Sequence, residues 1–412
     1  MPPIRGIGAS SITSPGPGLF FIRAFMGTII EPGRMLAQFQ GSCYYLSPMK
    51  AEVLFARYRP ATLEPKDSIG AKWMRLLDTL DLPGAVRGKR TAIKAHLGGG
   101  FGFTTVHPYF MRGLVSKVKE AGAREVFVTD THNAVHSAID RGYTPEVLGC
   151  PILPIAGFDE KDIVTTPLSP AFRTLTSVNA GGEILRAEAL IDFSHLKGHG
   201  SCGFGGASKN LSMGCFDEKT RASLHGLEGG LEWDPEACTL CKTCEENCPN
   251  KAISFPQDVF TVFYHNCKLC QHCVLICPQK AIVMKGGAFR DFQQGMALAS
   301  ARILSAFPRE NQLFITLLMD ITVFCDCWGM TTPALVPDIG ILAGRDIVAI
   351  EQAALDMVRT EDLIPGSLPT GWELRKGSHL FERIHGKDPF VVIEYLQALG
   401  WGTREYLLRE VM

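Results

Sequence analysis

Short runs of β-branched and apolar residues alternate with helix-like patterns from residue 49 to the C-terminal end of the chain. This alternation is typical of α/β proteins, in which helices cover the faces of a sheet. The pattern predicts strands over residues 51–58, 91–96, 125–130, 152–155, 189–193 and 313–323. We therefore expect a layered α/β domain whose sheet is mostly parallel.

Two segments, residues 108–121 and 346–359, carry apolar residues at helical spacing. The apolar positions are Phe110, Leu114 and Val118 in the first segment, and Ile347, Ile350, Ala354 and Met357 in the second. Spacings of three or four residues place such side chains on one face of a helix. Each segment is therefore expected to form a helix that packs against the sheet.

A cysteine-rich segment interrupts the alternation before a helix that we expect to begin near Phe289. Glycine pairs mark both ends of this segment, at residues 229–230 and 286–287. We therefore expect residues 49–228 and 288–412 to form one α/β domain. Residues 229–287 would be a small α+β module inserted into it.

Residues 1–48 differ from the rest of the chain because they are rich in proline, glycine and serine around a short apolar run at residues 19–30. Arg23 interrupts that run, and no clear cleavage site follows it, so we do not expect a secretion signal. The composition predicts a poorly ordered N-terminal extension instead.

Eight of the fourteen cysteines form two copies of the pattern C-x2-C-x2-C-x3-C-P. The second copy follows the first by 29 positions (267 − 238 = 29). Bacterial ferredoxins use this pattern to hold two [4Fe-4S] clusters, and the fourth cysteine of each copy binds the other cluster. The expected ligands are Cys238, Cys241, Cys244 and Cys277 for cluster 1, and Cys267, Cys270, Cys273 and Cys248 for cluster 2.

Zinc and disulfide bonds are the alternatives for these cysteines. Pairs of the form C-x2-C also suit tetrahedral zinc, but zinc ribbons lack a third cysteine at the same spacing and the proline that follows. Disulfide bonds are rare in a reducing compartment, and the cytoplasm is the location that we expect. The doubled pattern therefore favours a ferredoxin-like 2[4Fe-4S] module, whose clusters would replace a large apolar core.

The charge of the chain excludes some classes of partner. The 412 residues include 41 lysines and arginines and 42 aspartates and glutamates, which gives a formal net charge of −1. This balance provides no basic footprint for nucleic acid. No stretch approaches the roughly 20 apolar residues that a membrane-spanning helix needs.

Polar side chains follow several predicted strands. Lys94 and His96 stand at the end of one strand, and Asp130 ends the next. Ligands of open α/β sheets bind at the carboxyl ends of the strands. We therefore expect a substrate-binding site at this edge.

The segment from residue 192 to 215 adds further candidates. His195, Lys197 and His199 would share one face of an extended chain, because side chains alternate there. A glycine-rich loop follows, in which Lys209 and Asn210 would help to bind an anion. No phosphate-loop or dinucleotide fingerprint is complete in this chain, so no nucleotide site is inferred.

The pair Cys325 and Cys327 flanks a carboxylate. Such a pair can chelate a soft metal, receive a persulfide or cycle as a dithiol. A third metal site that combines this pair with Cys202 and Cys215 is an alternative. For a single cysteine, plain burial would be the simpler interpretation.

Together these stretches resemble the uncharacterised DUF362 family of iron-sulfur proteins. The matching stretches are AIKAHLGGG, FVTDTH, SHLKGHG, GFGGASKNLSMGC, both cysteine motifs, CDCWGM and PDIGILAGRDIVAIEQAALDM. The resemblance runs from about residue 49 to the C-terminal end, and it implies no particular reaction. The chain departs from the family where Gly99 to Gly102 replace a loop with an acidic residue, and where Glu351 replaces an aspartate.

These features predict a cytoplasmic iron-sulfur oxidoreductase that receives electrons from a redox partner protein. His195, Lys197 and His199 would supply protons, with the Cys325/Cys327 pair as a further catalytic group. Lys94, His96, Asp130, Lys209 and Asn210 would bind a small anionic substrate. The alternative is a non-enzymatic electron carrier, or a factor that delivers metal, cluster or sulfur from the Cys-Asp-Cys stretch. In a third interpretation the clusters only brace the fold.

Overall fold

The structure is a computed structural model that describes residues 50–411, apart from residues 265, 268, 270 and 271. The predicted N-terminal extension, residues 1–48, lies outside the described residues. So does Cys270, one of the eight predicted cluster ligands.

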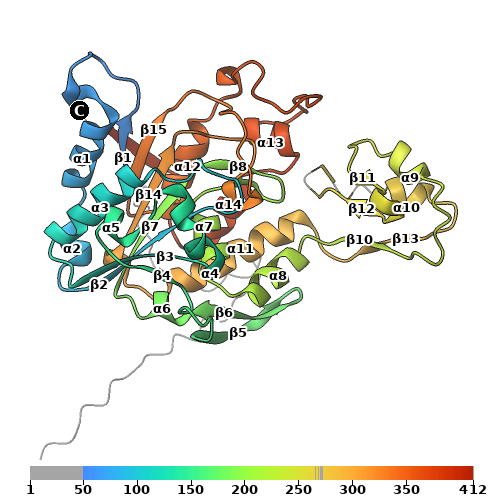
Figure 1. Ribbon diagram of the computed structural model, residues 1–412, viewed down its shortest axis with the longest axis horizontal. Coiled ribbons are helices and arrows are strands. Elements are labelled where there is room, and N and C mark those ends of the chain that lie inside the picture. The colour runs from blue at the N-terminus through green and yellow to red at the C-terminus, as the bar shows by residue number, and fades with distance from the viewer. Residues whose placement is uncertain (1–49, 265, 268, 270–271, 412) are drawn as a thin grey trace, which may run out of the picture. The chain divides into compact units, whose positions relative to one another are not determined.

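An eight-stranded sheet forms the centre of the α/β domain, with the strand order β16-β1-β15-β14-β7-β2-β3-β4 (Figure 1). The strands are β1 (Ala51–Arg57), β2 (Arg90–Ala95), β3 (Glu125–Asp130), β4 (Ile152–Pro154), β7 (Ala189–His195), β14 (Gln312–Leu318), β15 (Gly340–Gly344) and β16 (Tyr406–Glu410). Only β15 runs antiparallel to its two neighbours, β1 and β14. The prediction of an α/β domain with a mostly parallel sheet is therefore confirmed.

Side-chain alternation along the strands builds two cores, one on each face of the sheet. In β1, Val53 and Phe55 belong to one buried cluster, and Leu54 and Ala56 belong to the other. Successive side chains of a strand point to opposite faces, so a strand that is apolar at every position is covered on both sides.

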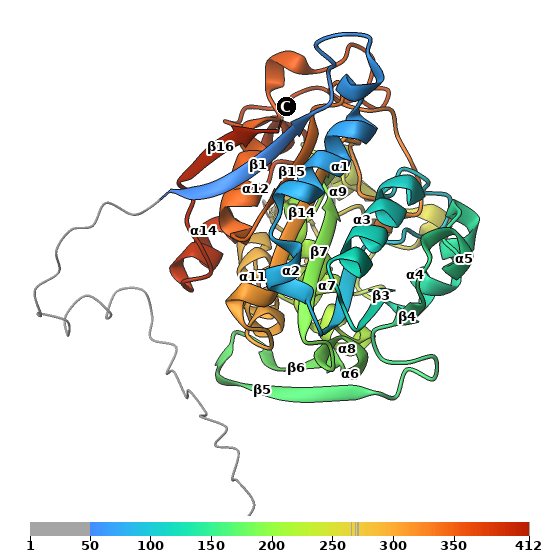
Figure 2. The ribbon, with the colours of Figure 1, turned by 90° about the vertical axis from the view of Figure 1, so that its left-hand side faces the viewer.

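Helices cover both faces of the sheet (Figure 2). One face carries α1 (Ile69–Thr79), α2 (Leu82–Val86) and α3 (Pro108–Glu120). The other carries α7 (Ala207–Gly214), α11 (Phe289–Leu304), α12 (Ile347–Asp356) and α14 (Val391–Ala398). The predicted helix over residues 108–121 is α3, which has Pro108 in its first turn and the side chain of His107 as its N-cap.

The remaining elements surround this frame. They are α4 (His132–His136), α5 (Pro145–Leu148), α6 (Gly182–Leu185), α8 (Glu218–Gly226), α13 (Leu380–His385), β8 (Lys197–His199), β9 (Gly203–Gly205) and the hairpin of β5 (Ile163–Phe172) and β6 (Leu175–Gly181). Across the described part of the chain, no helix combines the length and the apolar character needed to cross a membrane.

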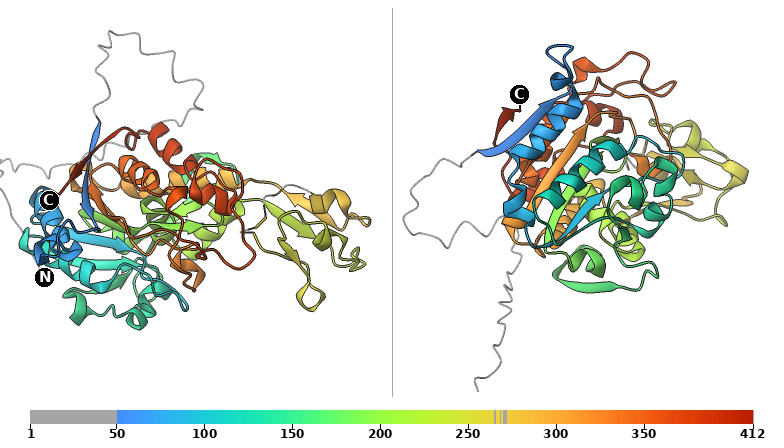
Figure 3. Two further views of the ribbon diagram at one scale, coloured as in Figure 1. Left: turned by 90° about the horizontal axis from the view of Figure 1, so that it is seen from above. Right: turned by 60° about the vertical axis from the view of Figure 1, so that its left-hand side comes forward.

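The cysteine-rich segment has its own strands and helices (Figure 3). They are β10 (Gly230–Trp233), α9 (Thr243–Glu246), β11 (Ile253–Ser254), β12 (Thr261–Val262), α10 (His272–Ile276) and β13 (Ile282–Lys285). The first and last strands pair antiparallel, so the chain leaves the α/β domain and returns to it side by side. Of the residues that the structure describes in this segment, eight form a separate buried cluster, and four of these are cysteines.

A glycine pair sits where the chain leaves and returns. Gly229 has φ +75° and Gly287 has φ +124°, both in the region that glycine favours. A Cβ atom on Gly229 would lie 2.8 Å from the carbonyl oxygen of Gly287. One on Gly287 would lie 2.6 Å from the amide nitrogen of Gly229, so both positions require glycine.

Candidate functional site

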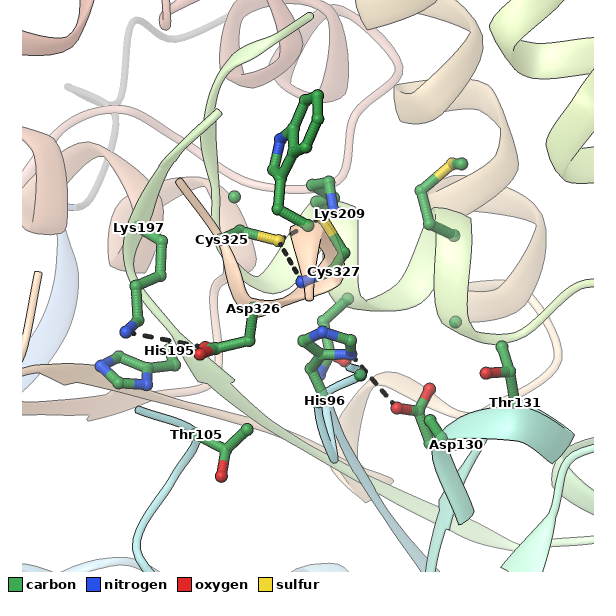
Figure 4. Close-up of a pocket in the computed structure, with 18 of the residues that line it drawn as sticks. His96, Thr105, Asp130, Thr131, His195, Lys197, Lys209, Cys325, Asp326 and Cys327 are labelled. Carbon is green, nitrogen blue, oxygen red and sulfur yellow. Dashed lines mark hydrogen bonds and ion pairs between the residues drawn. The ribbon is translucent and has the colours of Figure 1, made fainter. Parts of the chain in front are cut away.

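A cavity of about 730 Å³ opens at the carboxyl ends of β2, β3 and β7. Its volume falls within the range that holds small organic ligands. All ten residues predicted to bind substrate or to act in catalysis line it: Lys94, His96, Asp130, His195, Lys197, His199, Lys209, Asn210, Cys325 and Cys327. Figure 4 labels seven of them, all but Lys94, His199 and Asn210. The structure thus brings together residues from four separate parts of the sequence.

Lys94 is fully buried at the base of the cavity. Its Nζ donates to Asp130 Oδ1 at 3.0 Å and to Asn210 Oδ1 at 2.6 Å. The amide of Asn210 in turn donates to the backbone oxygen of Lys94 and to Asp192 Oδ2 at 2.8 Å. Lys94 and Asn210 therefore bond mainly to the protein itself, and they hold the helix α7 against β2.

Two carboxylates in this network have opposite pKa shifts. Burial would raise the pKa of Asp130, but Lys94 and the hydrogen bonds from His96 and Leu97 outweigh it and hold that pKa below its usual value. Burial dominates at Asp192 and raises the pKa of that carboxyl, despite the nearby charge of Lys94. Asp192 Oδ1 has no hydrogen-bond partner among the described residues, which agrees with a proton on this group.

His96 lies above Asp130, with Nδ1 at 3.3 Å from Asp130 Oδ2. About a third of its side chain is exposed to solvent. The same carboxylate oxygen accepts the backbone N–H of Leu97 at 2.9 Å. Asp130 therefore fixes the orientation of His96 at the cavity wall.

A second charged network surrounds Lys197. Its Nζ donates to Thr104 Oγ1 at 2.7 Å and lies 3.6 Å from Asp326 Oδ2. Thr104 donates to the other oxygen of Asp326 at 3.0 Å. Burial lowers the pKa of Lys197, and the charge of Asp326 opposes that shift. The sequence interpretation did not assign Asp326 to the site, although its place between two candidate cysteines was the available signal.

His195 is held as a neutral imidazole. Burial, followed by the charge of Lys197, lowers its pKa to about 3. Its Nε2–H donates to the backbone oxygen of Met319. Nδ1 has no hydrogen-bond partner within the described part of the chain, so it carries a lone pair. Nδ1 can therefore accept a hydrogen bond from a ligand, whereas the lowered pKa opposes full transfer of a proton to the ring.

The two cysteines of the Cys-Asp-Cys stretch stand on one tight turn. Cys325 caps a 3₁₀ helix, Asp326–Trp328, because its sulfur accepts the N–H of Cys327 at 3.3 Å. Lys209 reaches both sulfurs, with Nζ at 3.5 Å from Cys325 Sγ and 3.4 Å from Cys327 Sγ. Cys325 is buried, whereas Cys327 reaches solvent.

The two thiols have opposite pKa shifts. A hydrogen bond from Cys327 lowers the pKa of Cys325 well below its usual value, and Lys209 adds to this shift. The same bond raises the pKa of Cys327. Cys325 is therefore the thiolate of the pair, and thiolates are the reactive and metal-binding form of cysteine.

His199 joins this pair. One ligating atom each from His199, Cys325 and Cys327 lies within 4.8 Å of the other two. Cys202 lies behind the ring, with its sulfur 3.2 Å from His199 Nδ1. The group that the structure assembles thus contains His199 instead of the pair Cys202 and Cys215 that the sequence suggested as an alternative.

Lys209 and Asn210 lie in helix α7, where the sequence suggested a loop. Glu351 Oε1 accepts the N–H of Ser208 at 2.8 Å and its hydroxyl at 2.9 Å, at the first turn of this helix. The backbone N–H of Ser208 therefore already has a partner. An anion in the cavity would instead contact the side chains of Lys209 and Asn210. Burial raises the pKa of Glu351 to about 7. Neither Glu351 nor Asp192 could be placed here from the sequence, since their partners are remote in the chain.

The motif cysteines gather around two small hollows in the cysteine-rich segment. One is lined by Cys238, Cys241, Cys244 and Cys277. Cys248, Cys267 and Cys273 line the other. Each hollow thus combines cysteines of both motif copies, in the crossed sets that the spacing predicted, with Cys270 outside the described residues.

Two contacts join the cysteine-rich segment to the cavity wall. Phe263 stacks edge-on against Trp328, with ring centroids 5.9 Å apart, and Trp328 lines the cavity. Lys387 Nζ donates to the backbone oxygens of Tyr264 at 3.2 Å and Cys267 at 3.0 Å. The second cysteine motif is therefore anchored beside the Cys-Asp-Cys turn.

Among solved structures, a protein from Thermotoga maritima matches with a TM-score of 0.32 and 12% identity, over 63% of this chain and 52% of that chain. The lactate racemase apoprotein from Thermoanaerobacterium thermosaccharolyticum matches with a TM-score of 0.28 and 10% identity, over 65% and 51%. The chain thus spans about half the length of these two proteins. No curated protein matches it.

A family profile described as "Domain of unknown function (DUF362)" matches residues 91–356. The match covers more than half of the chain, and it includes all ten predicted residues of the cavity. It agrees with the resemblance seen in the sequence motifs. The chain therefore belongs to the DUF362 family.

Proposed function

We propose that the cysteine-rich segment is a ferredoxin-like module that holds two [4Fe-4S] clusters. The support is the donor set, since thiolates of both motif copies line each hollow. When bound, such clusters supply one-electron transfer. Electrons would come from a redox partner protein in a reducing compartment such as the cytoplasm.

We further propose that the cavity is the site where a small anionic substrate is reduced. The observation that carries this proposal is the convergence of cationic and thiol side chains in one cavity. The lysine and arginine residues of its lining are Lys94, Lys197, Lys209 and Arg221, and its carboxylates are Asp130 and Asp326. This excess of cations favours a carboxylate or phosphate group.

Proton transfer would fall to the network around Lys197. Its buried ammonium donates to Thr104 and faces Asp326, so a proton lost to a substrate would leave a neutral amine beside a carboxylate. His195 Nδ1 can accept a hydrogen bond from the substrate on the same wall. Lys197 would thus supply a proton that the reduction of an organic group consumes together with electrons.

The test begins with iron and sulfide counts on anaerobically purified protein, where we expect about eight of each per chain. Turnover of small carboxylates and phosphates with a chemical reductant is then measured for Lys209→Ala and Cys327→Ser. Both variants should lose turnover and keep the iron content and the electron paramagnetic resonance spectrum. Cys150→Ser is the matched control, because Cys150 is buried and does not line the cavity. Full turnover in both cavity variants would overturn the site.

A factor that delivers metal or sulfur is the second candidate function. The group of His199, Cys325 and Cys327 favours it, because Cys327 is exposed and could pass a bound ion or sulfur atom to a client. Sulfane sulfur or metal in excess of the clusters, lost in the double variant Cys325→Ser/Cys327→Ser and transferred to an apo-protein acceptor, would support delivery over reduction.

A further inference from the structure

We propose that His199, Cys325 and Cys327 bind a divalent metal ion such as zinc. The fourth coordination position of this ion would face the cavity and take an anionic oxygen ligand. One ligating atom of each side chain lies within 4.8 Å of the others, so a single ion can reach all three after small side-chain rotations. This site goes beyond electron delivery, and it stands whether or not the cysteine-rich segment holds iron.

The backbone holds His199 beside the thiols. The N–H of Gly198 in β8 donates to the backbone oxygen of Thr322 at 3.0 Å. A Cβ atom at Gly198 would lie 2.3 Å from the backbone oxygen of Val323, so only glycine allows this approach. The strand with His199 and the segment that leads to Cys325 are therefore fixed against each other before any ion binds.

The imidazole ring is also oriented. The N–H of Ser201 donates to His199 Nδ1 at 3.2 Å, and Cys202 Sγ lies at 3.2 Å from the same atom. A histidine that ligates through one ring nitrogen carries its proton on the other, so in the ion-bound site Nδ1 would donate to Cys202 Sγ and give up the contact with Ser201. His199 is 5% exposed and Cys325 is 6% exposed, so two of the three ligands are shielded from bulk water.

The ligand types select the metal. Two thiolates and one imidazole suit zinc and similar borderline-soft ions, and they are poor ligands for magnesium or calcium. Three protein ligands, with one position left for water or substrate, is the pattern of catalytic zinc sites. Residues of the group line the cavity, so the remaining position opens toward it.

The ammonium group of Lys209 lies beside the proposed ion site, where it can balance the negative charge of an anion bound to the ion. Its Nζ lies within 3.5 Å of both sulfurs. Gly205 makes room for it, because a Cβ atom there would meet Lys209 Cδ at 3.1 Å. The ammonium can therefore contact both the thiolates and a carboxylate or phosphate bound to the ion.

Cobalt titration of the full-length anaerobic protein tests the site. Each spectrum is read as the difference between the wild type and the double variant Cys325→Ser/Cys327→Ser, so cobalt bound elsewhere cancels. We expect about one equivalent of cobalt with thiolate charge-transfer bands. His199→Ala should weaken this binding at least about tenfold. Added acetate or inorganic phosphate should shift the visible cobalt bands.

His136→Ala and Cys150→Ser are the matched controls, since neither residue lines the cavity, and both should bind cobalt as the wild type does. Equal cobalt uptake in the wild type and in the double variant would overturn the site. An unchanged affinity in His199→Ala would overturn the assignment of the third ligand. Unchanged bands with both anions would overturn the open position.

A measurement on the wild-type protein tests the site without relying on variants that could misfold. Cys327 is exposed, so iodoacetamide should alkylate it in chelator-treated protein at a pH high enough to ionise its thiol. Added zinc should slow this alkylation at least about tenfold, as read from the mass of the peptide. Equal rates with and without zinc would count against the site. Iron and sulfide counts on the same samples report the proposed clusters separately.

Discussion

At the scale of single residues, the site is built from buried charges that compensate one another. Lys94 is paired with Asp130, and Lys197 is paired with Asp326, both with almost no exposure to solvent. A buried ion pair adds little stability compared with apolar residues, but the loss of one partner leaves an uncompensated charge. The two pairs therefore fix the positions of His96 and of the Cys-Asp-Cys turn more than they stabilise the fold.

Lys94→Met should destabilise the protein by about 3–5 kcal/mol, because Asp130 and Asn210 would both lose a buried partner. Urea unfolding measures this change. The double variant Lys94→Met/Asp130→Leu should recover part of the loss, since it leaves no buried charge at this position. Lys66→Met is the control, because the Lys66 side chain is 69% exposed. A single variant as stable as the wild type would contradict the role of the pair.

The sequence could predict the residues that face the cavity, because polar side chains at the ends of apolar strands have few other reasons to be there. Lys94, Asp130 and His195 follow this rule. The sequence could not predict which of these residues form hydrogen bonds within the protein and which are available to a ligand. Asn210 bonds to Lys94 and Asp192, and no local pattern links these three positions.

At the scale of elements, helix α7 carries two of the ten predicted cavity residues, Lys209 and Asn210, and is held in place by Glu351 of helix α12. The carboxylate accepts the N–H and the hydroxyl of Ser208, while its second oxygen, Oε2, has no partner among the residues that the structure describes. Glu351 is thus a positioning residue for Lys209 and Asn210.

Glu351 should make the stability of the protein depend on pH. Burial raises its pKa from 4.5 to about 7, so the native state binds this proton more tightly than the unfolded chain does. The stabilising contribution is complete below about pH 4.5 and is lost as the pH rises through 7. The urea midpoint of the wild type should therefore fall between pH 5 and 8 relative to that of Glu351→Gln.

Glu361→Gln serves as the control for this comparison, because Glu361 is exposed. Its urea midpoint should follow that of the wild type across the same pH range. Parallel curves for the wild type and Glu351→Gln would show that the buried carboxyl does not change its protonation on folding.

Helices and strands could be predicted where the local sequence has a strong pattern of apolar and polar residues. The strand over residues 125–130 and the start of the helix at Phe289 agree with the structure. The strand predicted over residues 313–323 ends at Leu318, because Asp320 adopts a positive φ of 45° and turns the chain. Strands β15 and β16 were not predicted, since β15 is short and glycine-bounded and most of β16 is exposed.

At the scale of the whole molecule, the α/β domain and the cysteine-rich segment are stabilised differently. The α/β domain has two extensive apolar cores. Among the described residues of the segment, the buried cluster has eight members, of which four are cysteines. A core of that size does not hold a fold without a metal or another cross-link.

If the segment holds the proposed clusters, their removal by a chelator should unfold the segment and leave the sheet intact. Hydrogen exchange read by mass spectrometry should lose protection in β10, α10 and β13, while β2, β3 and β7 keep theirs. Cys244→Ser should produce the same local loss without a chelator. Full protection of the segment in iron-free protein would mean that its small core is sufficient.

The glycine pair at Gly229 and Gly287 has a consequence for the history of the gene. The backbone oxygen of Leu227 accepts the N–H of Ala288 at 2.9 Å, so the chain is already closed across the base of the segment. One recombination event could thus add or remove the sixty or so codons of the segment, and the surrounding sheet would keep its sequence and its strand pairing. We expect some relatives to keep the lysine-lined cavity while lacking all eight motif cysteines.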